Sequence, residues 1–417
     1  MRIGFFVWEY PPRLVGGLGT YAQYITRDFV RMGNDVVVFT MNTGSLKTSE
    51  VIGGVSVHRP MGVDASAVLR LFANGELQSW GDQLRFFSGI MVNDILCSAK
   101  MVNSLVRMDR IQFDMACVHD WLGGMAGDIV KRELNLPLVF HVHSTEWGRS
   151  RGYGSKVVGD IERHTADIAD RVITVSYSMK EDLVSHGWPG DKIFVVWNGI
   201  DPQVYDPAKV DLEEVRALRR RYGVADDEKM VLFVGRLNWV KGIMNLVQAM
   251  PSVLHEYPKT KLVILGTGDE ENDIRSLVAR LGLQDSVACR FEFVSERERI
   301  LHYAASDVCA FPSRYEPFGI VSLEAMAMEK PIIVGASGVS GLKEQVVSAG
   351  PEKTGVHVDG NSPEDIAWGV REVLWNDTRA RQWGVKARER VIHYFTWEKA
   401  AKQTLSVYMD LVRAYKK

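Results

Sequence analysis

The sequence predicts an α/β protein with two doubly wound domains that face a cleft. Short apolar runs alternate with longer amphipathic stretches, which is typical of parallel strands covered by helices on both faces of a sheet. This pattern stops at a polar segment near the middle of the chain and then starts again. The 417 residues are enough for two or three domains at roughly 100–200 residues each.

Apolar runs of strand length mark the first half of the chain. They are Ile3–Trp8, Val36–Thr40, Met115–His119, Leu138–His141, Val172–Val175 and Ile193–Trp197. Between them lie stretches with the apolar spacing of helices, such as Tyr21–Met32 and Ile161–Ala169. We therefore expect a parallel sheet in this half.

The second half repeats the pattern with its own strands. They are predicted at Met230–Val234, Lys261–Leu265, Ser286–Phe293, Val308–Phe311, Pro331–Val334 and Gly355–Val358. The polar segment Asn198–Asp227 separates the two sets and carries Pro202, Pro207 and a run of arginines. This composition indicates a linker with a short helix.

These boundaries divide the chain into four parts. We expect a Rossmann-like domain at residues 1–200, a linker at 201–225, a second Rossmann-like domain at 226–395, and a C-terminal helix at 396–417 that packs back on the first domain. Thr396 suits the N-cap of that helix. Ligands of such sheets bind beyond the carboxyl ends of the strands, so the cleft between the domains is the expected site.

Composition excludes several classes of protein. Lys and Arg number 50 against 52 Asp and Glu, and the formal charge of −2 gives no broad basic surface for nucleic acid. Apolar residues are 46% and charged residues 24%, which excludes a wholly disordered chain. No run approaches the ~18 apolar residues of a membrane span, and the N-terminal run is too short for a signal peptide. We expect a cytoplasmic protein, with peripheral membrane contact left open.

A glycine-rich loop follows the first predicted strand. Gly16, Gly17 and Leu18 precede a helix, where backbone N–H groups and the helix N-terminus favour an anion. The loop can be aligned with the glycine fingerprint of dinucleotide-binding proteins. That fingerprint requires a tight turn after the first strand and an acid after the second strand, but Gly17 lies nine residues beyond Trp8 and no acid follows the second strand. We expect a phosphate-binding loop, and a glycine turn without a ligand is the alternative.

Polar residues follow two strands of the first domain at the edge where ligands are expected. His119-Asp120-Trp121 ends one strand, and His143 follows the next. His and Asp at these strand ends can hydrogen-bond sugar hydroxyls. Structural roles for Asp120 and His143 are the alternative.

A metal site is not expected. Of His119, His141 and His143, only His141 and His143 are predicted to share a face, and no carboxylate or Cys cluster completes the set. The cysteines at positions 97, 117, 289 and 309 form no C-x-x-C pair, which excludes a zinc ribbon and a thioredoxin-type site.

The loop after the first strand of the second domain carries two cations. Arg236 and Lys241 are five residues apart, between Gly235 and Gly242. Arg offers a planar fork and Lys a point charge, a combination that suits a diphosphate. Solvated surface cations are the alternative. A further glycine-rich loop at 335–344 offers backbone donors from the same side of the sheet.

The sharpest motif is Pro-Ser-Arg-Tyr-Glu-Pro-Phe-Gly at residues 312–319, followed by Glu324. Pro317 suits the first position of a helix that runs to about Glu329, so Glu316 would stand beside the helix N-terminus. Glu324 would lie roughly 12 Å further along, at about 1.5 Å per residue. Acids that far apart can bind two ends of an elongated ligand, and ribose hydroxyls would satisfy a buried Glu324. The alternative is a helix-terminal acid plus an acid tied to a nearby arginine.

Taken together, these motifs resemble retaining glycosyltransferases with the two-domain GT-B architecture, over essentially the whole chain. The nearest families are those of glycogen and starch synthases and of sucrose synthases with many α-glycosyltransferases. The most specific element is the E-x7-E motif, here Glu316 to Glu324. The cation pair comes second and the early Gly-Gly-Leu loop third. His119-Asp120-Trp121 is similar to the His-Asp-Trp of glycogen synthases in particular.

The resemblance implies a role for each motif. The first domain would take the acceptor and the second would bind the nucleotide sugar. Arg236 and Lys241 would neutralise the donor diphosphate. Glu316 would lie by the donor sugar and Glu324 by the ribose. His143 would contact the sugar, and Asp120 would line the acceptor side. The implied donor-binding residues are Gly16, Gly17, Leu18, Arg236, Lys241, Glu316, Phe318, Gly319, Ile320 and Glu324.

The sequence departs from glycogen synthases in three places. Leu14 stands where their glycine loop carries Lys, and the nearest cation is Arg13. Glu324 belongs to Ser-Leu-Glu-Ala, as in the broader family, and the late Gly-Gly-Leu is spaced out as Gly-Val-Ser-Gly-Leu. The expected fold and donor roles survive these departures, whereas the acceptor assignment is weakened.

The expected activity is transfer of a hexose, with glucose favoured, from UDP-glucose or ADP-glucose to an acceptor hydroxyl with the α-anomer retained. The favoured acceptor is an α-1,4-glucan, and no cofactor or metal is expected. Alternatives are an α-glycosyltransferase acting on a lipid or small sugar, such as a sucrose or trehalose synthase, a phosphorylase or a hydrolysing epimerase. A non-enzymatic sugar-nucleotide or glycan-binding protein is a further alternative. The sequence does not indicate an oligomeric state.

Overall fold

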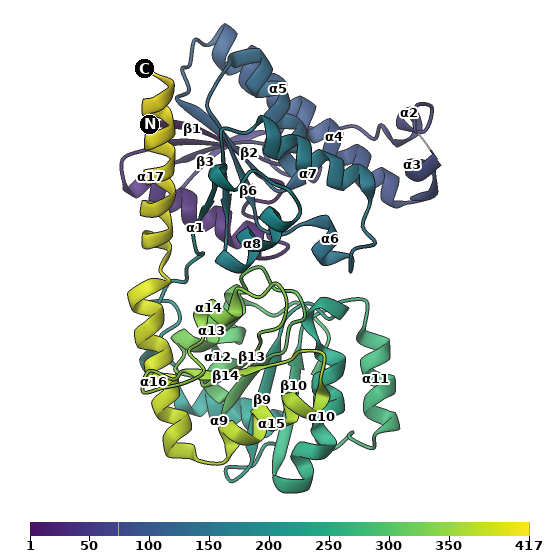
Figure 1. The fold of residues 1–417 in the computed structure, drawn as a ribbon, viewed down its shortest axis with the longest axis vertical. Coiled ribbons are helices and arrows are strands. Elements are labelled where there is room, and N and C mark those ends of the chain that lie inside the picture. The colour runs from purple at the N-terminus through teal and green to yellow at the C-terminus, as the bar shows by residue number, and fades with distance from the viewer. Residues whose placement is uncertain (74, 417) are drawn as a thin grey trace. The chain divides into compact units, whose positions relative to one another are not determined.

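A computed structural model describes residues 1–73 and 75–416, which divide into two compact units (Figure 1). Unit 1 comprises residues 1–175, 183–196 and the C-terminal segment from 397 onward. Unit 2 comprises residues 176–182 and 197–396. Each unit has its own sheet of mainly parallel strands, so the predicted pair of α/β domains is confirmed.

The sheet of unit 1 has eight strands in the order β3-β4-β2-β1-β5-β6-β7-β8. They are β1 (Arg2–Phe6), β2 (Asp35–Phe39), β3 (Ser49–Ile52), β4 (Val55–His58), β5 (Met115–His119), β6 (Leu138–Val142), β7 (Arg171–Thr174) and β8 (Ile193–Val195). Their pairings are parallel except for the hairpin of β3 and β4. This hairpin was not predicted from the sequence, because both strands are short and the edge strand β3 has no buried residue.

Helices cover both faces of the first sheet. The helices of unit 1 are α1 (Gly17–Arg31), α2 (Ser66–Leu69), α3 (Gly75–Ser79), α4 (Gln83–Ala99) with its π-helical continuation η1 (Lys100–Met108), α5 (Gly124–Leu134), α6 (Glu146–Arg149), α7 (Lys156–Ile168) and α17 (Trp397–Tyr415). Helix α8 (Tyr177–Ser185) begins in unit 2 and ends in unit 1. Tyr21 of α1 and Tyr408 of α17 reach His141, the register partner of His119. Gly127 of α5 packs on Val118 instead. Successive strand residues point to opposite faces, so α5 lies opposite α1 and α17.

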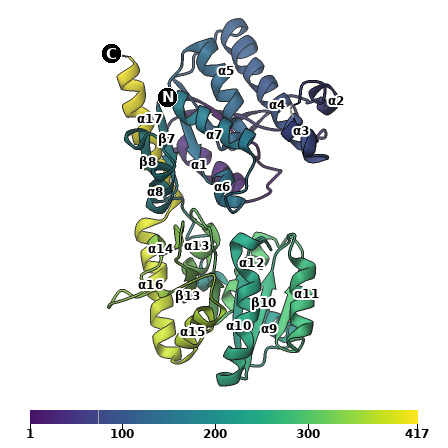
Figure 2. The ribbon, with the colours of Figure 1, turned by 45° about the vertical axis from the view of Figure 1, so that its right-hand side comes forward.

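The sheet of unit 2 has six parallel strands in the order β11-β10-β9-β12-β13-β14. They are β9 (Lys229–Val234), β10 (Thr260–Leu265), β11 (Val287–Arg290), β12 (Val308–Phe311), β13 (Ile332–Gly335) and β14 (Gly355–Val358). The helices are α9 (Leu212–Arg221), α10 (Ile243–Glu256), α11 (Glu271–Arg280), α12 (Glu296–Ala305), α13 (Ile320–Ala327), α14 (Leu342–Gln345), α15 (Pro363–Leu374) and α16 (Asp377–Tyr394), and Figure 2 shows them from another side. One apolar cluster joins α10, α11 and α15 to one face of the sheet.

Several helices begin where the sequence supplies a capping side chain. The hydroxyls of Ser155 and Ser362 and the amide oxygen of Asn376 accept hydrogen bonds from first-turn N–H groups of α7, α15 and α16. Pro363 follows Ser362 at the first helical position, where its missing N–H costs nothing.

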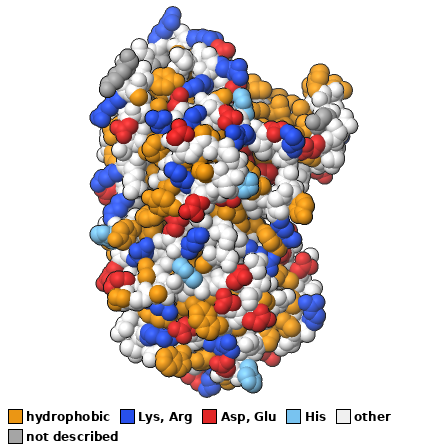
Figure 3. Space-filling view, in the orientation of Figure 1, with side chains coloured by type: hydrophobic (Ala, Val, Ile, Leu, Met, Phe, Trp, Pro, Cys, Tyr) orange, Lys and Arg blue, Asp and Glu red, His pale blue; other side chains and the backbone are white. Residues whose placement is uncertain are grey.

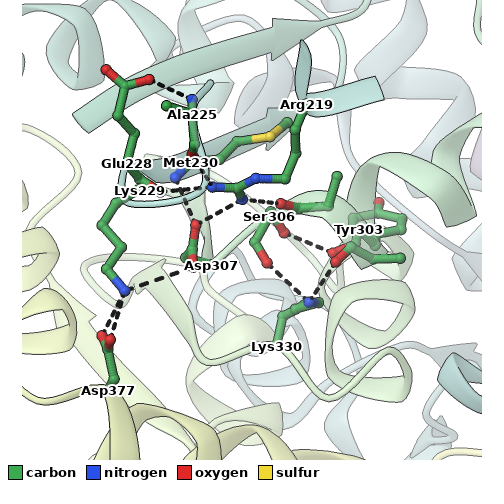
Figure 4. Close-up of polar contacts among 12 residues, drawn as sticks. Arg219, Ala225, Glu228, Lys229, Met230, Tyr303, Ser306, Asp307, Lys330 and Asp377 are labelled. Atoms are coloured by element: carbon green, nitrogen blue, oxygen red, sulfur yellow. Dashed lines mark hydrogen bonds and ion pairs between the residues drawn. The ribbon is translucent and has the colours of Figure 1, made fainter. Parts of the chain in front are cut away.

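A polar network lies at the amino ends of the strands of unit 2 (Figure 4). Arg219 of α9 donates to Asp307, just before β12, at 3.1 Å. Lys229 at the start of β9 pairs with Asp377 at 2.7 Å. Lys330 donates to two carbonyl groups at the end of α12. Since ligands of such sheets bind at the opposite, carboxyl edge, we assign this network to stability.

The surface shows no separation of charge on the face drawn in Figure 3, where basic and acidic side chains are interspersed. Within residues 1–73 and 75–416, no helix is long and apolar enough to cross a membrane.

Candidate active site

The loop after β9 carries the two predicted cations of unit 2. Arg236 is exposed and, among the residues that the structure describes, has no hydrogen-bond or ion-pair partner. The Lys241 ammonium pairs with Glu316 Oε2. Gly242 follows with a φ of +68°, and a Cβ there would lie 2.1 Å from the carbonyl oxygen of Pro312. Only glycine therefore lets this loop approach the one that bears Glu316.

Glu316 is held between the loops that follow β12 and β13, and its residue is only 8% exposed. Besides Lys241, its carboxylate is reached by the Ser313 hydroxyl at 3.5 Å. Its backbone N–H donates to Val339 O at 3.0 Å, and its carbonyl accepts from the Gly341 N–H at 2.8 Å. The two glycine-bearing loops thus fix the position of this acid at the carboxyl edge of the sheet.

The predicted helix start at Pro317 is wrong. Helix α13 begins at Ile320, and Gly319 before it adopts a φ of +84°. A Cβ on Gly319 would lie 2.7 Å from Leu342 Cδ2, so the chain turns through a conformation that Pro317 does not predict. Glu316 lies before this turn and outside the helix. The separation of roughly 12 Å from Glu324, which assumed a continuous helix between the two acids, therefore does not apply.

The turn itself consists of residues that the resemblance assigns to the donor. Phe318 is buried, and its carbonyl accepts from Gln345 Nε2 at 2.8 Å. Gly319 and Ile320 are partly exposed at the entrance of α13. The contacts of Phe318 give it a packing role. Direct contact with a donor stays a prediction for Phe318, Gly319 and Ile320.

Glu324 is 4% exposed and surrounded by donors from its own unit. Oε1 accepts from the Tyr205 hydroxyl at 2.8 Å and from Arg299 Nη2 at 3.2 Å. Oε2 accepts from the Tyr303 hydroxyl at 2.7 Å and from Arg299 Nε at 3.3 Å. About four acceptor positions are available on a carboxylate, so these contacts use them all. These contacts match the alternative considered from the sequence, in which Glu324 is tied to a nearby arginine. Contact between Glu324 and a ribose stays a prediction.

In unit 1, Asp120 and His143 lie together at the carboxyl ends of β5 and β6. Asp120 Oδ1 accepts from the His143 N–H at 2.7 Å and from the Ser144 N–H at 3.4 Å. Asp120 has a φ of +52°, a strained conformation for a residue with a side chain, and such strain is often found at functional sites. Burial lowers the pKa of His143, and the charge of Asp120 opposes this only in part. The ring is therefore neutral at pH 7.

The histidines are arranged differently from the prediction that only His141 and His143 share a face. Strands β5 and β6 pair so that His119 lies opposite His141, and their rings stack with centroids 4.6 Å apart. The centroid of His143 lies 5.7 Å from that of His119. The register between strands decides this, and it cannot be read from the apolar pattern of either strand alone.

This register also groups Cys117 with His119 and His141, whose possible ligand atoms lie within 4.8 Å of one another. All three residues are buried. His141 is already hydrogen-bonded to the hydroxyls of Tyr408, at 2.6 Å, and Tyr21, at 3.3 Å. A metal would have to compete with these contacts, and the expectation of no metal stays a prediction.

The glycine loop of unit 1 is supported by an acid that the sequence analysis missed. Glu9 is 4% exposed, and its Oε2 accepts from the N–H groups of Val15 and, at 3.1 Å, Gly16. The Gly16 amide is therefore engaged by an internal anion, while Gly17 and Leu18 form the first turn of α1. The available signal was an acid in the short segment between the first strand and a glycine loop.

In each unit, then, titratable groups gather at the carboxyl edge of a doubly wound sheet, and in unit 2 glycines allow the loops that carry them to pack closely. Two Rossmann-like units with a cation pair and acid in one, and a strained Asp-His pair in the other, define the class of GT-B glycosyltransferases.

Comparison with known proteins agrees with this class. The family described as Glycosyl transferases group 1 matches residues 214–390, and Glycosyltransferase Family 4 matches residues 15–204. An uncharacterized glycosyltransferase of Methanocaldococcus jannaschii is 36% identical over 98% of both chains. The chain belongs to the group 1 glycosyltransferases.

Other relatives carry more specific names. A glycogen synthase of Mycobacterium tuberculosis is 28% identical over 99% of this chain and 95% of its own. An alpha-maltose-1-phosphate synthase of Mycolicibacterium smegmatis is 31% identical over 98% of this chain and 99% of its own. Among solved structures, a sucrose-phosphate synthase from Thermosynechococcus elongatus has a TM-score of 0.81 at 24% identity, covering 99% of each chain. This last likeness concerns the fold.

Proposed function

We propose that this glycosyltransferase moves a hexose, with glucose favoured, from a nucleotide diphosphate sugar to an acceptor hydroxyl and retains the α-anomer. The observation that carries the proposal is the Lys241–Glu316 ion pair on the loops of neighbouring strands, with the exposed Arg236 on the same loop as Lys241. A cation already poised against one acid can exchange that partner for a phosphate oxygen.

The proposed chemistry relies on positioning and charge. Arg236 and Lys241 stabilise the diphosphate as its bond to the anomeric carbon breaks. The acceptor oxygen forms the new bond on the same face, and its proton passes to the departing diphosphate oxygen. Glu316, released from Lys241, holds the sugar where positive charge develops. In unit 1, the neutral ring of His143 offers a hydrogen bond to a sugar hydroxyl. Two side-chain cations supply the charge, so no divalent metal and no cofactor is proposed.

Glu324 is proposed to serve the nucleoside. Since four contacts from Tyr205, Tyr303 and Arg299 fill its carboxylate, a ribose hydroxyl binds by taking the place of one of them. The Tyr205 hydroxyl is the simplest to exchange, because it is a neutral donor on a segment outside the sheet and its layers.

For the acceptor, two candidates have specific support. An α-1,4-glucan is favoured by His119-Asp120-Trp121 and by the glycogen synthase among the relatives. A small acceptor that carries phosphate is favoured by the alpha-maltose-1-phosphate synthase, which is similar over nearly its full length.

Transfer is tested by a matrix of UDP-, ADP- and GDP-glucose against glycogen, maltose, sugar phosphates and lipid extracts, scored by release of the nucleotide diphosphate. Calorimetric titration of that nucleotide diphosphate then separates the acids. Glu324→Gln should weaken its binding, Tyr205→Phe should strengthen it, and Glu316→Gln should leave affinity nearly unchanged while depressing turnover. A wild type that binds the donor but transfers to no acceptor would favour a binding protein instead.

A further inference from the structure

We propose that Arg13 binds a phosphate group carried by the acceptor. The inference rests on the proposed transferase function and selects one substrate class for it: an acceptor that carries a phosphate as well as the reacting hydroxyl.

Arg13 is a partly buried cation that no acid neutralises among the described residues. Its backbone N–H donates to Tyr10 O at 3.2 Å, and its Nη1 donates to the weak acceptor Met41 Sδ at 3.7 Å. The acid closest in sequence, Glu9, has its Oε2 committed to the amides of the glycine loop. One positive charge therefore remains available beside the loop.

The guanidinium is also held in place. Arg13 Cζ lies 4.4 Å from the ring centroid of Trp8, a cation–π contact that fixes the plane of the fork. Trp8 Nε1 is buried and, within the described part of the chain, has no hydrogen-bond partner. A guanidinium is a donor only, so Arg13 offers hydrogen bonds to an anion and none to a cation. A planar, preorganised fork matches the oxygens of a phosphate in particular.

Arg13 and Trp8 lie in unit 1, the unit proposed to bind the acceptor. The Trp8 ring contacts Phe86 with centroids 5.6 Å apart, and Phe86 lies 6.3 Å from Trp121. Trp121 follows Asp120 directly, and β1 and β5 are neighbours in the sheet. Within one unit, a row of ring contacts thus runs from Trp8, under Arg13, to Trp121, the residue after Asp120. A neutral glucan has no group for Arg13, whereas a sugar phosphate can present its hydroxyl toward Asp120 and its phosphate to Arg13.

Matched acceptor pairs test the inference: glucose against glucose 1-phosphate and 6-phosphate, and fructose against fructose 6-phosphate, with glycogen and phosphatidylinositol vesicles in parallel. The wild type should prefer the phosphorylated member of at least one pair. Arg13→Ala should lower kcat/KM for that acceptor by ~10- to 150-fold, the usual effect of losing a charge-assisted hydrogen bond. It should leave the unphosphorylated member and the affinity for free nucleotide diphosphate unchanged. Arg13→Lys should retain part of the preference.

Two further variants separate the effect of the Arg13 charge from effects of packing and of surface charge in general. Arg13→Gln preserves much of the packing on Trp8 without the charge and should behave like Arg13→Ala. Arg132→Ala removes an exposed arginine of α5 that pairs with Asp128, and it should change nothing. Activity on phosphatidylinositol vesicles, lost in Arg13→Ala, would support the inference with a lipid headgroup as the source of the phosphate.

Other results would overturn the inference. A wild type that uses glycogen or free sugars and no phosphorylated acceptor would refute it while leaving the transferase proposal intact. Equal losses on both members of a pair would make Arg13 a packing residue. Weaker binding of free nucleotide diphosphate would assign Arg13 to the donor. Failure to transfer to any acceptor would overturn the proposed function, and this inference with it.

Discussion

Removing the lysine of the Lys241–Glu316 ion pair should destabilise unit 2 as well as slow transfer. The two side chains are 21% and 10% exposed. Among the residues that the structure describes, Ser313, at 3.5 Å, is the one other group that reaches the Glu316 carboxylate. Stranding a fully buried charge costs about 3–5 kcal/mol. Water can partly replace the ammonium at this exposure, so we expect a loss of about 2 kcal/mol for Lys241→Ala. For a unit of this size that corresponds to a fall of about 4–8 °C in Tm.

Thermal unfolding followed by tryptophan fluorescence measures this loss, and a double variant separates it from catalysis. Adding Glu316→Gln to Lys241→Ala removes the stranded charge and should recover most of the lost Tm, because the amide needs no counter-ion. Transfer should stay impaired, since both groups of the proposed site are gone.

A matched surface pair provides the control. Lys259 pairs with Asp227, but these side chains are 67% and 64% exposed. Lys259→Ala should therefore leave Tm essentially unchanged, because exposed ion pairs contribute little to stability. If Lys241→Ala melts with the wild type, or if Glu316→Gln fails to restore the double variant, the reasoning about a stranded carboxylate is refuted.

Three further outcomes follow from the site and its surroundings. Arg236→Ala should slow transfer by ~10- to 150-fold through the lost charge-assisted contact, and wild-type kinetics would show that the diphosphate binds elsewhere. Dialysis against a chelator should leave activity intact, and a loss that only Mg²⁺ or Mn²⁺ restores would contradict a metal-free mechanism. Burial raises the pKa of Glu162 from 4.5 to about 8. Between these pH values the folded chain holds a proton that the unfolded chain releases, so stability falls as pH rises through this window. Urea unfolding at several pH values should show that Glu162→Gln flattens the fall, and an unchanged pH profile would contradict this.

The architecture was predictable because buried parallel strands appear in the sequence as continuous apolar runs. Strands β5, β12 and β14 have the predicted boundaries, and most others differ by one or two residues. The edge hairpin β3–β4 was not found, since Ser49–Ile52 alternates between exposed and half-buried positions and lacks an apolar core face. Its turn at Gly53-Gly54 was the one available signal.

The candidate site was only partly predictable. Residues placed at strand ends, such as Lys241 and Asp120, could be found from their position along the chain. Partners that depend on tertiary packing could not: no local pattern brings Tyr205 to Glu324 across 119 residues. The start of α13 was mispredicted because Pro317 satisfies the local rule for a first helical residue, whereas close packing around Gly319 decides the turn. Local signals therefore pointed to the candidate site, and the contacts within it required the structure.

The most direct test of the proposed retaining transfer is the anomeric configuration of the product. Wild-type enzyme is incubated with an α-linked nucleotide diphosphate glucose and the best acceptor of the matrix, and the new linkage is followed by proton NMR from the first turnover. We predict the small anomeric coupling of an α-linkage, formed together with one equivalent of nucleotide diphosphate. A β-linked product, or release of nucleotide diphosphate with free glucose as the only sugar product, would contradict the account.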